Sequence, residues 1–125
     1  MKHLEKTTDF CRVYGLRMPI IMAPMAGACP TELAAAVSNA GGMGACGVLP
    51  LKPDQISSWA KKFRSETNGA FLLNSWVPDP EPIQDPSHEE LVRAFLSSFG
   101  PEVTLAHGSA FQISFEEQCQ AMLEA

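Results

Sequence analysis

The sequence has few cysteines, and none of them stands in a metal-binding or redox pattern. Cys11, Cys29, Cys46 and Cys119 lie far apart, with no Cys-x-x-Cys pair and no histidine at ligand spacing beside them. Structural zinc and dithiol redox sites need such pairs, so the pattern predicts no metal site. Four free, buried thiols are the simplest interpretation.

Basic residues are also scarce, and long apolar runs are missing. Nine lysines and arginines stand against 14 aspartates and glutamates, which gives a net charge of -5. A field of that sign repels phosphate backbones and anionic lipid surfaces, so we expect no nucleic acid and no membrane as a partner. The polar start of the chain does not resemble a signal peptide, and we therefore expect a reduced, cytoplasmic setting.

Only three histidines are present, and none has neighbours typical of a catalytic site. His3, His88 and His107 lack an adjacent serine, cysteine or acid pattern that would indicate a triad or a metal site. His88 falls in the first turn of a predicted helix and His107 in a loop. Both side chains are expected to be exposed to solvent.

What the chain does contain is an alternation of apolar strands and amphipathic helices. Continuous apolar runs at 18–22 and 70–73 are typical of strands buried on both faces of a parallel sheet, and 42–48 predicts a strand of small residues. Helices are predicted from Pro30 and from Pro53, because proline suits the first helical turn. This order predicts an α/β fold with parallel strands.

The predicted buried faces of two helices follow from helical spacing. The helix after Pro30 is expected to place four apolar side chains on one face, and a last helix near the end of the chain is expected to group three apolar side chains on one face. These residues are Leu33, Ala36, Val37 and Ala40 in the first case, and Phe115, Cys119 and Met122 in the second.

Segments before and after this alternation also predict local structure. Residues 1–17 form a lead-in segment with a short helix capped at Thr8 or Asp9. Residues 77–86 contain four prolines, which exclude a helix or a central strand and indicate an extended loop. Capping boxes that begin at Ser87 and Ser114 then predict two further helices.

The run from Gly42 to Gly47 matches the pattern G-x-G-x-x-G, but its context excludes a dinucleotide-binding fingerprint. That fingerprint follows a strand and opens a helix, whereas here an alanine-rich helix precedes and the extended residues 48–50 follow. Close packing of a strand built from small residues explains the glycines better.

Two features follow predicted strands at points where ligands commonly bind. Ala23, Pro24 and Met25 form a bend after the first strand, and Asn74 follows the last. The carboxyl ends of parallel strands share one edge of the sheet, so we expect these residues to lie near each other. An amide there can both donate to and accept from a heterocycle. A plain strand terminator is the alternative interpretation of the bend.

The stretches PIIMAPMAGACPTELAAAVSNAGGMGACG (19–47) and FLLNSWVPDP (71–80) resemble the nitronate monooxygenase family, formerly called 2-nitropropane dioxygenases. The family consists of FMN-dependent (β/α)₈ barrels that oxidise alkyl nitronates with O₂. The resemblance implies that residues 1–125 are the amino-terminal part of a TIM barrel, an incomplete barrel of about three βα units. Residues 18–76 would hold three strands and two helices, and 77–125 a proline-rich loop and helical insertion.

The resemblance also assigns roles to the bend and to the amide. It implies that Ala23, Pro24 and Met25 lie against the flavin ring and that Asn74 hydrogen-bonds FMN. In the family, the catalytic histidine and the glycine-rich loops that hold the FMN phosphate come later than residue 125. We therefore expect no catalytic residue in this chain, and we expect a fragment or truncated product that is inactive alone.

Two alternatives stay open from the sequence. An FMN-dependent enoyl-thioester reductase has a barrel that opens with a similar strand, turn and alanine-rich helix. The chain could instead be a non-catalytic interaction module that associates with itself through open sheet edges, because unpaired parallel strands invite pairing.

Overall fold

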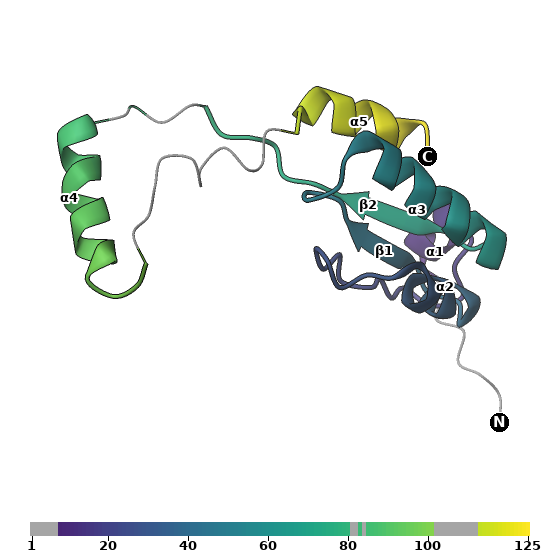
Figure 1. Ribbon diagram of the computed structural model, residues 1–125. Coiled ribbons are helices and arrows are strands. Elements are labelled where there is room, and N and C mark those ends of the chain that lie inside the picture. The colour runs from purple at the N-terminus through teal and green to yellow at the C-terminus, as the bar shows by residue number, and fades with distance from the viewer. Residues whose placement is uncertain (1–7, 81–82, 84, 102–112) are drawn as a thin grey trace. The chain divides into compact units, whose positions relative to one another are not determined.

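The computed structural model describes residues 8–80, 83, 85–101 and 113–125. These residues form two compact units: 8–76 with 113–125 make up the first, and the described residues between 77 and 101 make up the second. The elements (Figure 1) are α1 (Asp9–Tyr14), α2 (Thr31–Asn39), β1 (Gly44–Gly47), α3 (Pro53–Glu66), β2 (Phe71–Asn74), α4 (Pro86–Ser97) and α5 (Phe115–Leu123). The last helix, α5, therefore belongs to the same unit as α1, α2, α3 and the sheet.

The sheet of the first unit is parallel, as predicted. β1 and β2 pair in a parallel ladder, with Gly44 opposite Phe71 and Gly47 opposite Asn74. On the other side of β1, the segment 20–26 adds two isolated parallel bridges. The spatial order of these three extended segments is their order along the chain, which is typical of successive βα units.

The prediction of a strand over 18–22, buried on both faces, is wrong. The backbone pairs with Met43, the residue before β1, through two hydrogen bonds, from Met22 N–H to the Met43 carbonyl and from Met43 N–H to the Ile20 carbonyl, both at 2.9 Å. These contacts form only isolated bridges. Ile20 and Ile21 are 54% and 46% exposed, because no element of the described chain covers them.

The main core lies between the sheet and helices α2 and α3, with α5 packed against α3. Phe63 of α3 is fully buried, stacks on Trp59 with ring centroids 5.4 Å apart, and contacts Phe71 of β2 at 4.8 Å. A second, smaller cluster forms around Cys11 and Met43, with Leu72 packed against it. Burial of such aromatic and aliphatic area is the dominant stabilising contribution to the fold.

The predicted buried face of α2 is wrong except at Val37, which is partly buried and packs against the core. Leu33 is 43% exposed, and Ala36 and Ala40 are also exposed. The side chains that α2 buries are smaller or polar: Thr31, Ala34, Ala35 and Ser38. The close approach of β1 to α2 explains why these small side chains are buried.

That strand, β1, brings its backbone unusually close to the helix. A Cβ added to Gly44 would lie 2.5 Å from the Ala34 carbonyl oxygen, so only glycine fits there. The Ser38 hydroxyl accepts from the Gly44 N–H and donates to the Ala70 carbonyl, both at 2.9 Å. The helix therefore turns its smallest side chains to the sheet. The interpretation of 42–47 as a closely packed strand is confirmed.

The helix starts agree with the predicted caps except at α4. The Thr8 side chain accepts from the Cys11 N–H, and the Ser114 side chain accepts from the Glu117 N–H. The capping box predicted at Ser87 is wrong. The Asp85 carboxylate accepts from the Ser87 and His88 N–H groups instead, because the helix begins at Pro86.

The second unit buries no residue of its helix α4. His88 is exposed, as expected, whereas His3 and His107 lie outside the described residues. Its apolar side chains are exposed as well, among them Phe95 and Phe99, whose ring centroids lie 5.0 Å apart.

Candidate functional site

The predicted site residues lie at one edge of the sheet. Gly47 pairs with Asn74 in the β1–β2 ladder, and on its other side Gly47 bridges to Ala26. The end of the bend, the end of β1 and the end of β2 therefore form one row across three neighbouring segments. Since neighbouring strands lie about 4.8 Å apart, Ala26 and Asn74 are separated by about 10 Å.

The bend itself is a tight turn around Pro24. The Met25 N–H donates to the Ala23 carbonyl at 3.0 Å, and the Ala28 N–H donates to the Met25 carbonyl at 3.2 Å. Gly27 follows with a φ of 73°, a conformation that favours glycine. Met25 is 44% exposed, so the turn presents an apolar side chain at this edge.

Gly47 allows the bend to lie directly against β1. A Cβ at this position would be 2.8 Å from both the Pro24 carbonyl oxygen and the Ala26 nitrogen. Both neighbours are backbone atoms, which cannot rotate away. The glycine therefore sets the distance between the bend and the strand, and any larger residue would push them apart.

Asn74 offers an unused amide beside this row. Its backbone carbonyl accepts from the Val48 N–H at 2.8 Å, which fixes the end of β2 to the segment that follows β1. Its side chain is exposed and makes no hydrogen bond within the described residues. One carbonyl and one NH₂ group are thus available to a ligand.

Gln118 of α5 holds the segment that follows β1, and no pattern in the sequence predicted this role. Its side chain is 2% exposed, and its Nε2 donates to the carbonyl oxygens of Val48, Leu49 and Leu51 at 3.2, 3.0 and 2.7 Å. Its Oε1 accepts from the Ser75 hydroxyl at 3.4 Å. The predicted face of α5, formed by Phe115, Cys119 and Met122, is only half-buried.

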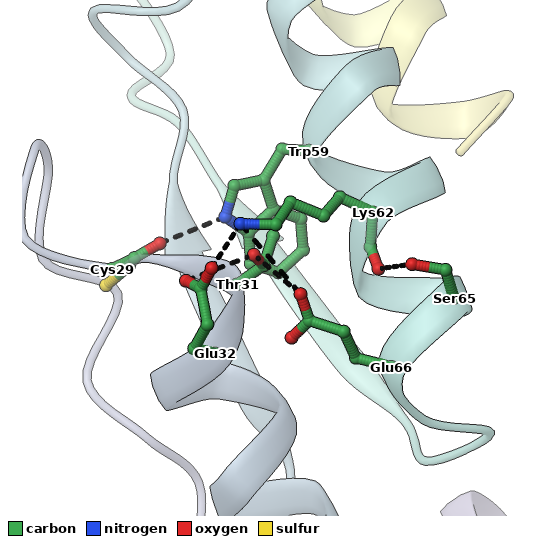
Figure 2. Close-up of polar contacts among 7 residues, drawn as sticks. All are labelled: Cys29, Thr31, Glu32, Trp59, Lys62, Ser65 and Glu66. Carbon is green, nitrogen blue, oxygen red and sulfur yellow. Dashed lines mark hydrogen bonds and ion pairs between the residues drawn. The ribbon is translucent and has the colours of Figure 1, made fainter.

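Polar contacts connect α3 to α2 and to Cys29, which lies between the bend and α2 (Figure 2). The Trp59 indole N–H donates to the Cys29 carbonyl at 2.9 Å, and Lys62 forms an ion pair with Glu32. The hydrogen bond from Lys62 lowers the pKa of the Glu32 carboxyl, and the same bond raises the pKa of Lys62. Both side chains are largely exposed, so this pair contributes little to stability.

Two of the four cysteines, Cys29 and Cys46, lie near the edge. Cys29 and Cys46 are both buried, and burial, with a smaller contribution from Cys29, raises the pKa of the Cys46 thiol to about 11. At neutral pH Cys46 is therefore a neutral thiol and a poor nucleophile. No group of His, Cys, Asp and Glu within the described ranges is arranged to hold a metal ion.

None of the helices that the structure describes is long and apolar enough to cross a bilayer.

The family model for nitronate monooxygenase matches residues 9–111. The chain belongs to the nitronate monooxygenase family. The resemblance found in the bend and in the segment around Asn74 is thereby confirmed at the level of the family, and the matched range includes both.

Curated relatives agree with this assignment. A nitronate monooxygenase from Pseudomonas aeruginosa is 31% identical over 99 residues, which cover 77% of this chain and 28% of the relative. One from Paraburkholderia phytofirmans is 41% identical over 66 residues, which cover 53% of this chain and 18% of the relative. The chain thus spans less than a third of the length of either relative.

Two solved structures show the same arrangement of elements. Nitroalkane oxidase from Streptomyces ansochromogenes superposes with a TM-score of 0.57 at 32% identity, over 66% of this chain and 23% of that one. FabK from Thermotoga maritima gives a TM-score of 0.53 at 30% identity, over 76% of this chain and 29% of that one. Both are TIM-barrel enzymes, and this member of the nitronate monooxygenase family shares their α/β character with parallel strands.

Proposed function

We propose that this chain supplies the amino-terminal wall of the FMN site in a nitronate monooxygenase that oxidises alkyl nitronates with O₂. The observation that carries the proposal is the row formed by Ala26, Gly47 and Asn74 at the carboxyl edge of the sheet. Ligands of parallel α/β enzymes bind at this edge. The same proposal makes the chain part of a TIM barrel whose first three βα units are 18–76 and 113–125.

The residues at the edge fit a planar heterocycle with polar rims. The bend offers exposed backbone and the apolar Met25 side chain, which suit contact with a ring face. Asn74 offers a donor and an acceptor without an intramolecular partner in the described chain, which suits the polar rim of the ring. Gly47 keeps the two at a fixed spacing. FMN, when bound, would supply the electron-transfer chemistry.

The chain's own residues would bind and orient, and none of those described at the edge would act as a base. The neighbouring Cys46 thiol stays protonated at neutral pH, and His88 belongs to the second unit. Ala23, Pro24, Met25 and Asn74 are therefore proposed as cofactor contacts only. The nitronate, O₂ and the proton-transferring group belong to the proposed activity of the whole enzyme.

A titration with FMN tests the proposal. Flavin fluorescence is followed as the chain is added, for the wild type, for Asn74→Ala and for Asn68→Ala as the matched control. Asn68 is an exposed amide just before the opposite end of β2. We expect binding by the wild type and the control, and about fivefold weaker binding by Asn74→Ala, since one hydrogen bond contributes about 1 kcal/mol.

Two outcomes would contradict the proposal. Absence of FMN binding by the wild type would remove the chain's role in the site, and equal affinities for Asn74→Ala and Asn68→Ala would remove the role of Asn74. NADH oxidation with an enoyl thioester, rather than O₂ consumption with a nitronate, would favour the reductase alternative for the whole enzyme.

A further inference from the structure

The Cys29 thiol closes the bend at the candidate site. It accepts from the Met25 N–H at 3.0 Å and lies 3.6 Å from the Ala23 carbonyl oxygen, to which it donates. These are the two backbone groups that also bond to each other across Pro24, at 3.0 Å. The sulfur thus bridges both ends of the turn that presents Pro24 and Met25.

Cys29 is itself held in place from the opposite side. Its carbonyl accepts from the Trp59 indole N–H at 2.9 Å, as Figure 2 shows. Trp59 stacks on Phe63, with ring planes 14° apart, and lies edge-on to Phe71 with ring centroids 5.6 Å apart. The aromatic cluster of α3 and β2 therefore fixes the backbone of Cys29. The Cys29 thiol in turn holds the bend through its contacts with Met25 and Ala23.

We propose that Cys29 is a positioning residue, whose thiol sets the conformation of the Pro24–Met25 turn that faces the flavin. The inference rests on the proposed function for its consequence, and on the contacts above for its geometry. The thiol is buried, at 6% exposure, so its role is to shape the turn and not to react. Without the thiol, the Met25 N–H keeps only its bond to the Ala23 carbonyl across Pro24.

Amide hydrogen exchange followed by NMR tests the geometry without any activity assay. The variants are Cys29→Ala, which removes the donor and acceptor, and Cys29→Ser, which keeps both on a shorter side chain. Cys11→Ala is the matched control, because it removes an equally buried thiol from the second cluster. The exchange rate of the Met25 amide is compared with that of the buried Phe63 amide, which reports general loss of stability.

We expect the Met25 amide to exchange about fivefold faster in Cys29→Ala relative to Phe63, as the loss of one hydrogen bond implies. Cys29→Ser should lie between this variant and the wild type, and Cys11→Ala should leave the ratio unchanged. An unchanged ratio in Cys29→Ala, or an equal change in Cys11→Ala, would overturn the inference.

FMN affinity of the same variants tests the consequence. We expect weaker binding in Cys29→Ala, partial recovery in Cys29→Ser, and wild-type affinity in Cys11→Ala. If the wild type binds FMN and Cys29→Ala binds equally well, the inference is wrong while the proposed function stands. If the wild type binds no FMN, the proposed function and this flavin role both fail, and the exchange ratio still decides whether the thiol holds the turn.

Discussion

Replacing Gln118 with alanine tests how the last helix holds the carboxyl edge of the sheet. The side chain is buried between α5 and the segment that follows β1, where its NH₂ group contacts three carbonyl oxygens. Truncation removes these contacts together with the bond from the Ser75 hydroxyl. The variant should therefore have a lower free energy of unfolding than the wild type.

The loss is smaller than four independent hydrogen bonds. The Val48 carbonyl keeps the Leu51 N–H at 2.8 Å, so it is not left without a donor. The carbonyls of Leu49 and Leu51 are only partly buried, so water can replace the amide there. About two net hydrogen bonds remain to be lost, together with some buried side-chain area. We expect a loss of about 2–3 kcal/mol in the free energy of unfolding.

Urea unfolding followed by circular dichroism measures this difference. Gln120→Ala is the control, because this residue has the same side chain on the same helix, is exposed and bonds only to Glu124. Its change should stay within about 0.5 kcal/mol, which is usual for surface substitutions. The supporting role of Gln118 is refuted if both variants lose the same stability, or if Gln118→Ala loses less than about 0.5 kcal/mol.

Three further predictions concern the helix packing and the thiol behind the edge. Gly44→Ala would bring a Cβ to 2.5 Å from the Ala34 carbonyl, so the same urea experiment should show a loss of about 1–3 kcal/mol; unchanged stability would contradict the close packing. Lys62→Ala should raise the pKa of Glu32 toward its ordinary value of 4.5, as read by carboxyl NMR titration, and an unmoved pKa would argue against their ion pair. The folded-state pKa of Cys46 is raised from 9.0 to about 11, so its contribution to stability is complete below pH 9 and is lost as the pH rises toward 11. Cys46→Ala should flatten this part of the pH dependence of the urea midpoint, and an equally steep fall in the variant would refute the assignment.

The alternation of strands and helices could be predicted because it depends on local pattern. α3 begins at Pro53, as predicted, and buries Ile56, Ala60 and Phe63. The position of the bend and of Asn74 at the same edge of the sheet could also be predicted, since parallel strands place their carboxyl ends at one edge. Their role as flavin contacts stays a prediction.

The errors arise where distant contacts decide between similar local choices. Alanines and small residues line most of α2, so spacing alone could not tell that Gly44 would draw Ala34 and Ser38 inward rather than Leu33. Gln118 contacts a segment about 70 residues earlier in the chain, and a glutamine in an acidic helix ordinarily indicates a solvent-facing position. At α4, the helix begins at Pro86, so the Asp85 carboxylate caps it in place of the predicted Ser87.

The central claim is that the bend and the end of β2 face one bound flavin, and amide chemical shifts measure this most directly. FMN is titrated into the ¹⁵N-labelled chain. We predict that the largest shifts fall on Met25, Gly47 and Asn74, while the amides of Asn68 and Gly69 before the opposite end of β2 stay unchanged. Shifts centred on Asn68 and Gly69, or shifts at Asn74 without any at Met25 and Gly47, would contradict the account.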